Sequence, residues 1–326
     1  MAENVSIYRI NEQANHKLPL KILVCCNKPE SLPSLNDGIL FTIQSGKALT
    51  DTDLHMQADD ELNGQPCDNI STKNESYGEF TAMYWAWKHL RTIYPDVKYV
   101  GWSHYRRLFA FDDTGSVQAK ILKPESEIAN YKADWQSVIK ILDAGKIILV
   151  KPEKLSPTVQ KHFQGIHYLA DYEVLKGVIR EYFPDYYDDF INVMERNSEI
   201  SLYCMFVMKY DDFVKYCEWL FAVLEKVEPQ IPYQYYDAYQ KRVLAFMAER
   251  LINVYVRKNK MNVEYRSIYF YSGSTGSAVH YSKFVVSVHN VLHMFRSFCR
   301  KHNIFWPLKM NKNTILRALK KFPLKH

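Results

Sequence analysis

The sequence lacks the motifs that identify the commonest catalytic classes. It contains no P-loop, no G-x-G-x-x-G segment, no H-E-x-x-H pair and no cysteine set with zinc-ligand spacing. Each of these motifs places defined backbone or side-chain groups on a phosphate, a dinucleotide or a metal ion. P-loop nucleotide hydrolysis, Rossmann-type hydride transfer and zinc catalysis therefore lack their usual signals.

Cysteine pairs and long apolar runs are also missing. The six cysteines show no C-x-x-C spacing, and no apolar leader precedes the first strand-like run. Cysteine use of this kind is typical of a reducing cytoplasm, which we take as the expected location. No apolar stretch approaches the roughly 20 residues that a spanning helix needs, so we expect a chain that does not cross a membrane by itself.

Tyrosine, by contrast, is abundant. The chain has 326 residues, is 47% hydrophobic and includes 24 tyrosines. This length and composition can bury a full core, so we expect one large domain, or one domain with an appendage. Tyrosine rings suit sugars because they offer an apolar face and a hydroxyl, although core packing explains many of them equally well.

Positive charge is concentrated at the C-terminal end. The last acidic residue is Glu264, and residues 265–326 carry eleven of the 42 lysines and arginines, which leaves 31 basic against 36 acidic residues in the remainder. Such a tail favours a polyanionic partner. We expect an anionic membrane surface and no nucleic acid, because the basic residues are not spread over the body.

The tail also has helical periodicity. An apolar stripe with basic residues beside it predicts an amphipathic helix, which would anchor the protein to the inner face of the membrane or pack its stripe on the body. We therefore divide the chain into a domain over 1–264 and a basic amphipathic tail over 265–326. The stripe consists of Phe284, Val285, Val288, Val291, Leu292, Phe295 and Phe298.

Strand and helix patterns alternate along the body. Short β-branched runs predict strands at 21–26, 39–46, 97–104, 146–152 and 201–209. Helical patterns lie between them, most clearly after a capping box, Ser76-x-x-Glu79, and again at 211–227 and 237–258. This alternation predicts an α/β fold with a mainly parallel central sheet flanked by helices.

The segment YVGWSHYRRLF (99–109) places a polar cluster where a buried strand ends. Ligands of open α/β sheets bind outside the carboxyl ends of the strands, so His104, Arg106 and Arg107 form a candidate site. Arginine suits a diphosphate because its guanidinium is permanently charged and binds two oxygens. A structural salt-bridge network is the alternative, and His104 could instead ligate a metal or cap a turn.

A second candidate lies at the predicted helix entry over 69–79. Asn69, Asn74, Tyr77 and Glu79 stand where backbone N–H groups and the helix dipole favour an anion such as a diphosphate. Simple capping of the helix by Asn74 or a nearby serine explains the same polar residues.

Two pairs of residues could supply a general base. His167 and Asp171 are four residues apart, so one helix face could hold Asp171 as the base and His167 beside the acceptor. That spacing is also an ordinary helix-surface interaction. Glu249 and Arg250 form the second pair, which could equally be a structural ion pair.

The segments NISTKNESYGEFTAMYWAWK (69–88) and YVGWSHYRRLF, with further matches at 205–221 and 240–256, resemble the bacterial capsule and O-antigen glycosyltransferases first catalogued as domain of unknown function 4422. The resemblance covers about 20–260 and implies a single GT-A-like nucleotide-sugar domain. It also implies transfer of a hexosyl unit, galactofuranose among the candidates, from a UDP-sugar to a lipid-linked saccharide, with inversion. The alternative is a non-catalytic saccharide- or membrane-binding scaffold.

The resemblance also suggests where ligands bind. The donor would lie on the helix entry and on His104, Tyr105, Arg106 and Arg107, which occupy the place of the Asp-x-Asp metal motif of related enzymes. A guanidinium there could do the work of a divalent cation, so manganese or magnesium stays an open alternative. Cys204 stands where the family tends to have asparagine, and we assign it with Glu249 and Arg250 to the acceptor side.

Overall fold

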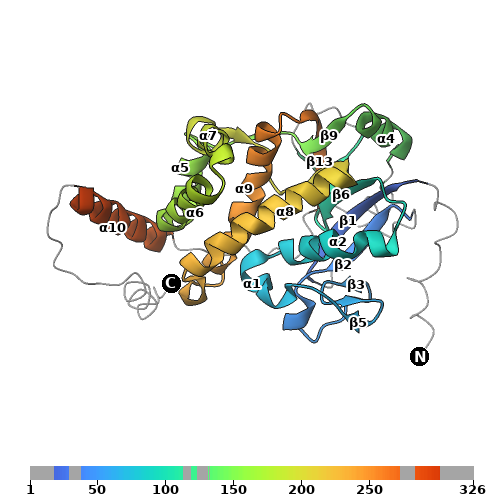
Figure 1. Cartoon of the computed structure of the whole chain (residues 1–326), viewed down its shortest axis with the longest axis horizontal. Coiled ribbons are helices and arrows are strands. Elements are labelled where there is room, and N and C mark those ends of the chain that lie inside the picture. The colour runs from blue at the N-terminus through green and yellow to red at the C-terminus, as the bar shows by residue number, and fades with distance from the viewer. Residues whose placement is uncertain are drawn as a thin grey trace.

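A computed structural model describes residues 18–28, 38–112, 119–122, 131, 133–271 and 283–301. Helices flank a mixed β-sheet, and Figure 1 shows α2 (Phe80–Ile93) and α8 (Tyr210–Val227) crossing in front of its strands. The strands of the main sheet are β1 (Leu20–Cys26), β2 (Leu40–Gln44), β3 (Gln57–Ala58), β6 (Tyr99–His104), β7 (Arg107–Ala110), β8 (Ala119–Leu122), β9 (Lys146–Val150), β12 (Phe206–Lys209) and β13 (Asn262–Tyr271).

Most of the remaining elements lie in the helical layers around this sheet. Two small antiparallel sheets consist of β4 (Glu61–Leu62) with β5 (Gln65–Pro66), and β10 (Glu153–Lys154) with β11 (Glu199–Ile200). The other helices are α1 (Asn74–Tyr77), α4 (Trp135–Asp143), α5 (Val159–Ile166), α6 (Leu169–Tyr182), α7 (Pro184–Ile191), α9 (Val243–Lys258) and α10 (Lys283–Lys301). A π-helical turn spans Asn192–Arg196, and short 3-10 turns connect α8 to α9.

The strands divide their side chains between two cores, because successive residues of a strand point to opposite faces. In β9, Ile147 and Leu149 join the core beneath α2, α8 and α9, whereas Ile148 and Val150 join the core beneath α4. The sheet is therefore covered on both faces. This explains why its strands read as continuous apolar runs in the sequence.

The sheet is mixed, with parallel and antiparallel pairs. Parallel ladders join β1 to β2 and β6, β2 to β3, and β13 to β8 and β9. Antiparallel ladders join β12 to β6 and β9, and β7 to β6 and β13. The expectation of parallel strands is thus correct for β1, β2, β3 and β6 and for the pairs of β13 with β8 and β9, and it is wrong for β7 and β12. The antiparallel β12 departs from the expectation because the chain turns back at residues 201–205 before it begins.

Strand β1 lies at the point where the chain changes direction across the sheet. From β1 the chain builds β2 and β3 on one side and then returns to place β6 on the other side. The carboxyl ends of β1 and β6 meet at Cys25, which is paired with His104. This is the topological switch point at which α/β sheets bind ligands.

Close packing around β6 requires a glycine. A β-carbon on Gly101 would come within 2.9 Å of Ile22 in β1 and 3.2 Å of the Phe206 carbonyl oxygen in β12. Only hydrogen fits this space, so Gly101 lets two strands approach β6 together.

The predicted helix after the capping box forms as two pieces. Helix α1 ends at Tyr77, and α2 begins at Phe80 after Gly78, whose φ is 53°. Ser76 does not cap a helix here, because it lies inside α1 and its hydroxyl donates to the Lys73 carbonyl oxygen at 3.3 Å. The break turns Gly78 and Glu79 toward the carboxyl end of β1.

The predicted tail begins inside the sheet and continues as α10. The boundary at 264 falls within β13, so residues 265–271 are strand residues. Helix α10 packs on α5 and α6, with Val286, His289 and Asn290 buried in that contact. The Asn290 side chain accepts from the Leu169 N–H at 2.7 Å and donates to the His167 carbonyl oxygen at 3.1 Å. The remainder of the tail lies outside the described residues.

Candidate active site

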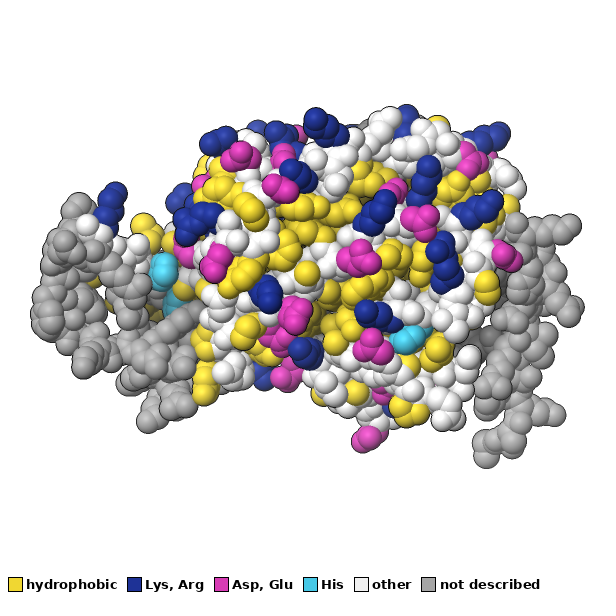
Figure 2. Space-filling view, viewed as in Figure 1, with side chains coloured by type: hydrophobic (Ala, Val, Ile, Leu, Met, Phe, Trp, Pro, Cys, Tyr) yellow, Lys and Arg dark blue, Asp and Glu magenta, His cyan; other side chains and the backbone are white. Residues whose placement is uncertain are grey.

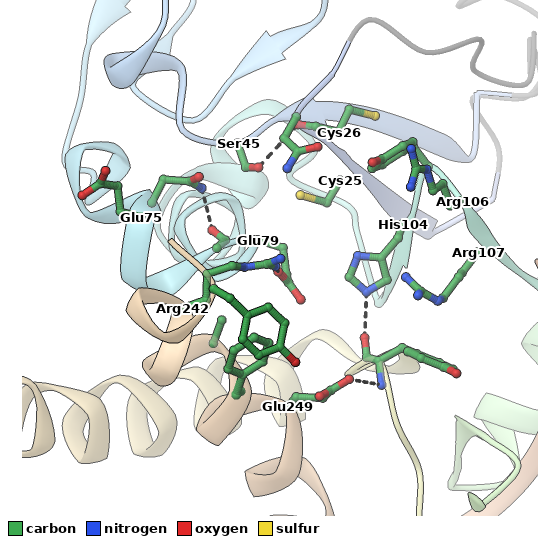
Figure 3. Close-up of a pocket in the computed structure, with 18 of the residues that line it drawn as sticks. Cys25, Cys26, Ser45, Glu75, Glu79, His104, Arg106, Arg107, Arg242 and Glu249 are labelled. Atoms are coloured by element: carbon green, nitrogen blue, oxygen red, sulfur yellow. Dashed lines mark hydrogen bonds and ion pairs between the residues drawn. The ribbon is translucent and has the colours of Figure 1, made fainter. Parts of the chain in front are cut away.

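A cavity of about 880 Å³ opens at the carboxyl ends of β1 and β6 (Figure 3). One wall comes from β1, β6 and the start of β7, and the facing wall comes from α1 and α9 with the turns between α8 and α9. The residues that line it are Cys25, Cys26, Asn27, Ser45, Asn74, Glu75, Gly78, Glu79, His104, Tyr105, Arg106, Arg107, Tyr203, Tyr236, Ala238, Tyr239, Lys241, Arg242, Ala245, Phe246, Glu249 and Phe270.

His104 ends β6 and is buried beside the cavity. Its Nε2 lies 2.7 Å from the carbonyl oxygen of Tyr203. A carbonyl only accepts hydrogen bonds, so Nε2 carries the proton and donates. Burial lowers the pKa of His104, as does the positive charge of Arg107, whereas Glu79 acts in the opposite direction. The neutral Nε2–H form is therefore favoured near pH 7, which leaves Nδ1 as an acceptor.

Arg107 provides a fixed positive charge in the cavity wall. Its guanidinium carbon lies 4.3 Å from the centre of the Tyr203 ring and 5.2 Å from that of Phe270. Its Nε is buried and has no hydrogen-bond acceptor among the residues that the structure describes. Within those same residues, no carboxylate oxygen lies within 4.0 Å of the guanidinium. The charge is held by aromatic rings and left available to an anion.

Arg106 adds a second cation next to Arg107. Its guanidinium carbon lies 5.1 Å from the centre of the Tyr105 ring, and both side chains line the cavity. Figure 3 shows Arg106 and Arg107 on the same side of the cavity as His104. The two adjacent arginines both reach the cavity, because the chain makes a tight turn between β6 and β7 and is not extended there.

The facing wall carries charges of both signs. Arg242 Nη2 lies 3.4 Å from Glu79 Oε2, and Lys241 Nζ lies 3.0 Å from Glu75 Oε2. Glu79 extends between Arg242 and His104 in Figure 3. Gly78 permits this approach, since a β-carbon there would lie 3.4 Å from Arg242 Nη2. Glu79 is thus a carboxylate that faces the cavity close to cationic side chains.

Two comparisons with known proteins identify relatives of this chain. A family profile described as a domain of unknown function, DUF4422, matches residues 21–260. The chain belongs to the DUF4422 family. Its structure is similar to the apo structure of the WbbM bifunctional glycosyltransferase, with a TM-score of 0.66 and 28% sequence identity. The match covers 81% of this chain and 47% of that one, so the chain spans about half the length of the solved relative. No curated protein matches it.

The cavity of the DUF4422 chain brings together many residues predicted to bind the donor. Asn74, Glu79, His104, Tyr105, Arg106 and Arg107 all line it. The Asn74 side chain also holds the local fold, because its amide donates to the Gly78 carbonyl oxygen at 2.7 Å and it packs on Gly46. Asn69 and Tyr77 are not among the lining residues. Asn69 donates to the Cys67 carbonyl oxygen at 2.8 Å, and Tyr77 donates to Glu228 at 3.0 Å.

Of the three residues assigned to the acceptor side, the structure places only Glu249 in the cavity lining. Cys204 is buried, with its sulfur 3.5 Å from the Tyr216 hydroxyl oxygen. Arg250 is 3% exposed, and one of its terminal nitrogens donates to the Phe246 carbonyl oxygen at 2.6 Å. Burial lowers the pKa of Arg250, and the nearby Glu249 carboxylate opposes this. Cys204 and Arg250 therefore do not line the cavity, and each contacts other residues of the protein behind its wall.

The pair predicted to act in catalysis lies one layer behind the wall. Asp171 is 1% exposed and accepts from the Tyr236 hydroxyl at 2.7 Å. His167 is fully buried, its ring centre lies 4.2 Å from that of Phe246, and its Nδ1 lies 3.1 Å from the Gln240 side-chain oxygen. Burial lowers the pKa of His167 well below its usual value. The two residues support lining side chains, and their roles as base and acceptor-positioning group stay predictions.

Sequence patterns missed much of the facing wall. Tyr236, Tyr239 and Arg242 line the cavity from the segment between α8 and α9, and Phe246 lines it from the first turn of α9. The tyrosine-rich run IPYQYYDAY, just before α9, is a feature of the sequence that could have indicated these residues. Tyr203 was likewise missed, because it lies inside a segment predicted as a strand.

The described residues contain no group of three or more His, Cys, Asp or Glu side chains arranged to hold a metal ion. The family resemblance predicts that His104, Tyr105 and Arg106 replace the Asp-x-Asp motif of related enzymes. These side chains do not form the oxygen-rich set that magnesium or manganese prefers. The charge available to a diphosphate here is that of the guanidinium groups.

Proposed function

We propose that the protein is a glycosyltransferase that moves a hexosyl unit from a UDP-sugar to a saccharide acceptor. The DUF4422 family and the similarity to a solved glycosyltransferase support the general activity. The observation that carries the proposal is Arg107, whose charge faces the cavity between two aromatic rings, without a carboxylate partner among the described residues. Arg107 is partly buried, and its buried Nε has no acceptor among the described residues, so this charge favours an anionic ligand in the cavity.

The diphosphate of the donor fits this charge. As the bond from the sugar to the diphosphate breaks, negative charge develops on the departing oxygen. Preorganised guanidinium groups stabilise such charge more strongly in a partly closed cavity than in water. We assign Arg107 and Arg106 to the diphosphate, with His104 beside them.

A base is needed on the acceptor side if the transfer inverts the anomeric carbon. We assign Glu79 to this role, because it faces the cavity across from the arginine pair and is held by Arg242 at 3.4 Å. The acceptor hydroxyl loses its proton to Glu79 while its oxygen bonds to the anomeric carbon, and the bond to the UDP oxygen breaks. Asp171 would act through Tyr236, whose hydroxyl donates a hydrogen bond to the Asp171 carboxylate at 2.7 Å.

The finer identity of the substrates follows from the family resemblance. We propose galactofuranose as a candidate sugar, a lipid-linked saccharide as the acceptor, and capsule or O-antigen synthesis as the process. The strand order around β1 and β6 supports a GT-A-like nucleotide-sugar domain. A non-catalytic saccharide-binding scaffold is the second candidate, favoured by the tyrosine and phenylalanine rings of the facing wall.

Binding of nucleotide sugars separates the two candidates. We expect UDP and UDP-hexoses to raise the melting temperature of the purified chain, measured by thermal shift and confirmed by calorimetry, because binding to the native state alone stabilises it. The shift should persist in EDTA if the arginines neutralise the diphosphate. Stabilisation by free saccharides but by no UDP- or GDP-sugar would support the scaffold instead.

We further propose that α10 binds the anionic inner face of the membrane. The helix contains Phe284, which is 66% exposed, and Val291, which is 61% exposed, and the tail beyond 264 has no acidic residue. No helix among the described residues is long and apolar enough to span a membrane. An exposed apolar face beside basic residues favours the lipid interface. On the face of the body shown in Figure 2, by contrast, Lys and Arg side chains are interspersed with Asp and Glu.

Replacing both Phe284 and Val291 by serine should reduce sedimentation with vesicles that contain phosphatidylserine. The change removes apolar area from the interface and leaves the basic residues in place, so we expect a loss of about tenfold in partitioning. Ser287→Ala, at an exposed position of the same helix, is the matched control. Equal sedimentation of the double variant and the control would contradict membrane binding through this face.

A further inference from the structure

The segment before β12 adopts an unusual backbone conformation. Tyr203 and Cys204 have φ values of 68° and 47°, in the left-handed region that residues other than glycine rarely adopt. Two such residues in succession are strained and persist only when surrounding contacts hold them. We call residues 201–204 the Tyr203 turn. Strain of this kind next to a cavity indicates a constraint connected with function.

Helix α9 holds the Tyr203 turn at two points. Glu249 Oε1 accepts from the Tyr203 N–H at 2.7 Å, and Asn253 Oδ1 accepts from the Ser201 N–H at 2.8 Å. Asn253 also donates to the Ser201 carbonyl oxygen at 2.9 Å. Glu249 and Asn253 are four residues apart, so they lie on one face of the helix. One helix face thus grips the turn.

The Tyr203 turn also contacts two residues that we propose bind the donor. The Tyr203 carbonyl oxygen accepts from His104 Nε2 at 2.7 Å, and the Tyr203 ring lies 4.3 Å from the Arg107 guanidinium carbon. Figure 3 shows this chain of contacts, with dashed lines joining Glu249 to the turn and the turn to His104. A movement of the Tyr203 backbone would therefore disturb both the tautomer of His104 and the place of Arg107.

We infer that Glu249 is a positioning residue, which holds the strained Tyr203 turn and through it sets the His104 tautomer and the place of Arg107. The inference rests on the proposed donor site and adds a residue to it. One carboxylate oxygen of Glu249 is engaged by a backbone N–H, and the other lies 3.5 Å from Arg250 Nη1. Both oxygens thus have partners within the protein, unlike those of a group free to take a proton from the acceptor.

Glutamine and alanine at position 249 distinguish positioning from base catalysis. In Glu249→Gln the amide oxygen still accepts from the Tyr203 N–H, so UDP affinity by calorimetry should stay within about threefold of wild type and most turnover should remain. In Glu249→Ala the N–H loses its acceptor and the turn relaxes. We expect UDP affinity to fall about tenfold and the donor KM to rise with it, because Arg107 and His104 shift.

Two measurements report on the turn without any ligand. Hydrogen exchange of the Tyr203 amide should speed up in Glu249→Ala and stay slow in Glu249→Gln. Nitrogen chemical shifts of His104 should report the Nε2–H tautomer in wild type and Glu249→Gln, and a mixture in Glu249→Ala. Adding Cys204→Gly to Glu249→Ala should restore much of the lost affinity, because glycine adopts positive φ without strain. Arg257→Ala changes an exposed residue of the same helix that pairs with Asp189 and not with the turn, so it controls for general weakening and should leave the exchange and the shifts unchanged.

The outcomes separate this inference from the proposed function. If wild type binds no UDP or UDP-sugar, the proposed function fails, while hydrogen exchange and the His104 shifts still decide whether Glu249 sets the turn and the tautomer. Unchanged exchange and shifts in Glu249→Ala would overturn the inference. So would a loss of turnover above a hundredfold in Glu249→Gln with UDP binding intact, which would make Glu249 the base.

Discussion

Replacing Arg107 by alanine is expected to lower kcat/KM for the UDP-sugar by about 100-fold or more, the range seen when one preorganised charge-stabilising donor is removed. The guanidinium is held between Tyr203 and Phe270 and has no carboxylate partner among the described residues. Its removal should therefore leave the fold intact, and only the interaction with the bound diphosphate should be lost. The effect should appear in UDP affinity as well as in turnover, since the diphosphate is bound before the sugar is transferred.

Two further arginine variants sharpen this test. Arg107→Lys keeps the charge but loses the planar fork, so it should recover part of the affinity and little of the rate. Arg257→Ala removes an exposed arginine that pairs with Asp189 at 3.0 Å, away from the cavity, and should behave as wild type. If Arg107→Ala binds UDP as tightly as Arg257→Ala does, the diphosphate lies elsewhere.

Replacing Glu79 by glutamine is expected to reduce kcat by about 10²–10⁴-fold, the usual contribution of a general base, while UDP affinity stays within about threefold. Glutamine has nearly the same shape and can still accept from Arg242, so the cavity wall should persist. What is lost is the ability to take the proton of the acceptor hydroxyl. The separation of kcat from donor binding distinguishes this variant from Arg107→Ala, which should impair both.

Glu75→Gln provides the matched control for Glu79→Gln. Glu75 lines the same cavity but its side chain is 64% exposed, and it pairs with Lys241 at 3.0 Å. An exposed pair of this kind contributes little, so the control should keep nearly full activity. Equal kcat for Glu79→Gln and Glu75→Gln would show that Glu79 is not the base. Asp171, acting through Tyr236, would then be the next candidate to test.

Local sequence patterns placed one group of cavity residues correctly at the end of a buried strand. The apolar run at 97–104 predicted a buried strand, and its polar end marked His104, Arg106 and Arg107, which all line the cavity. The placement was predictable because the strand and the polar cluster are adjacent in sequence, and cavities of α/β sheets form at the carboxyl ends of parallel strands. The DUF4422 resemblance over 69–109 pointed to the same place.

Patterns were less informative where distant segments meet. His167 and Asp171 were chosen as a pair because four residues separate them, yet each is buried behind a different lining tyrosine. The spacing of two residues along a helix predicts that their side chains point the same way, but it does not predict what that side of the helix contacts. Most of the facing wall comes from residues 236–249, and nothing local shows that this segment lies across from β6.

The sequence by itself determined the alternation of strands and helices, the cationic end of β6, the basic tail and the family. Each of these features depends on residues that are adjacent in the sequence. The tertiary structure alone decided that the sheet is mixed, that Glu79 and Glu249 meet His104 in one cavity, and that Tyr203 and Cys204 form a strained turn. Contacts such as that between Glu249 and Tyr203 join residues 46 positions apart. Their geometry depends on how α9 packs against the sheet, and the packing of whole elements has no signature in a local pattern.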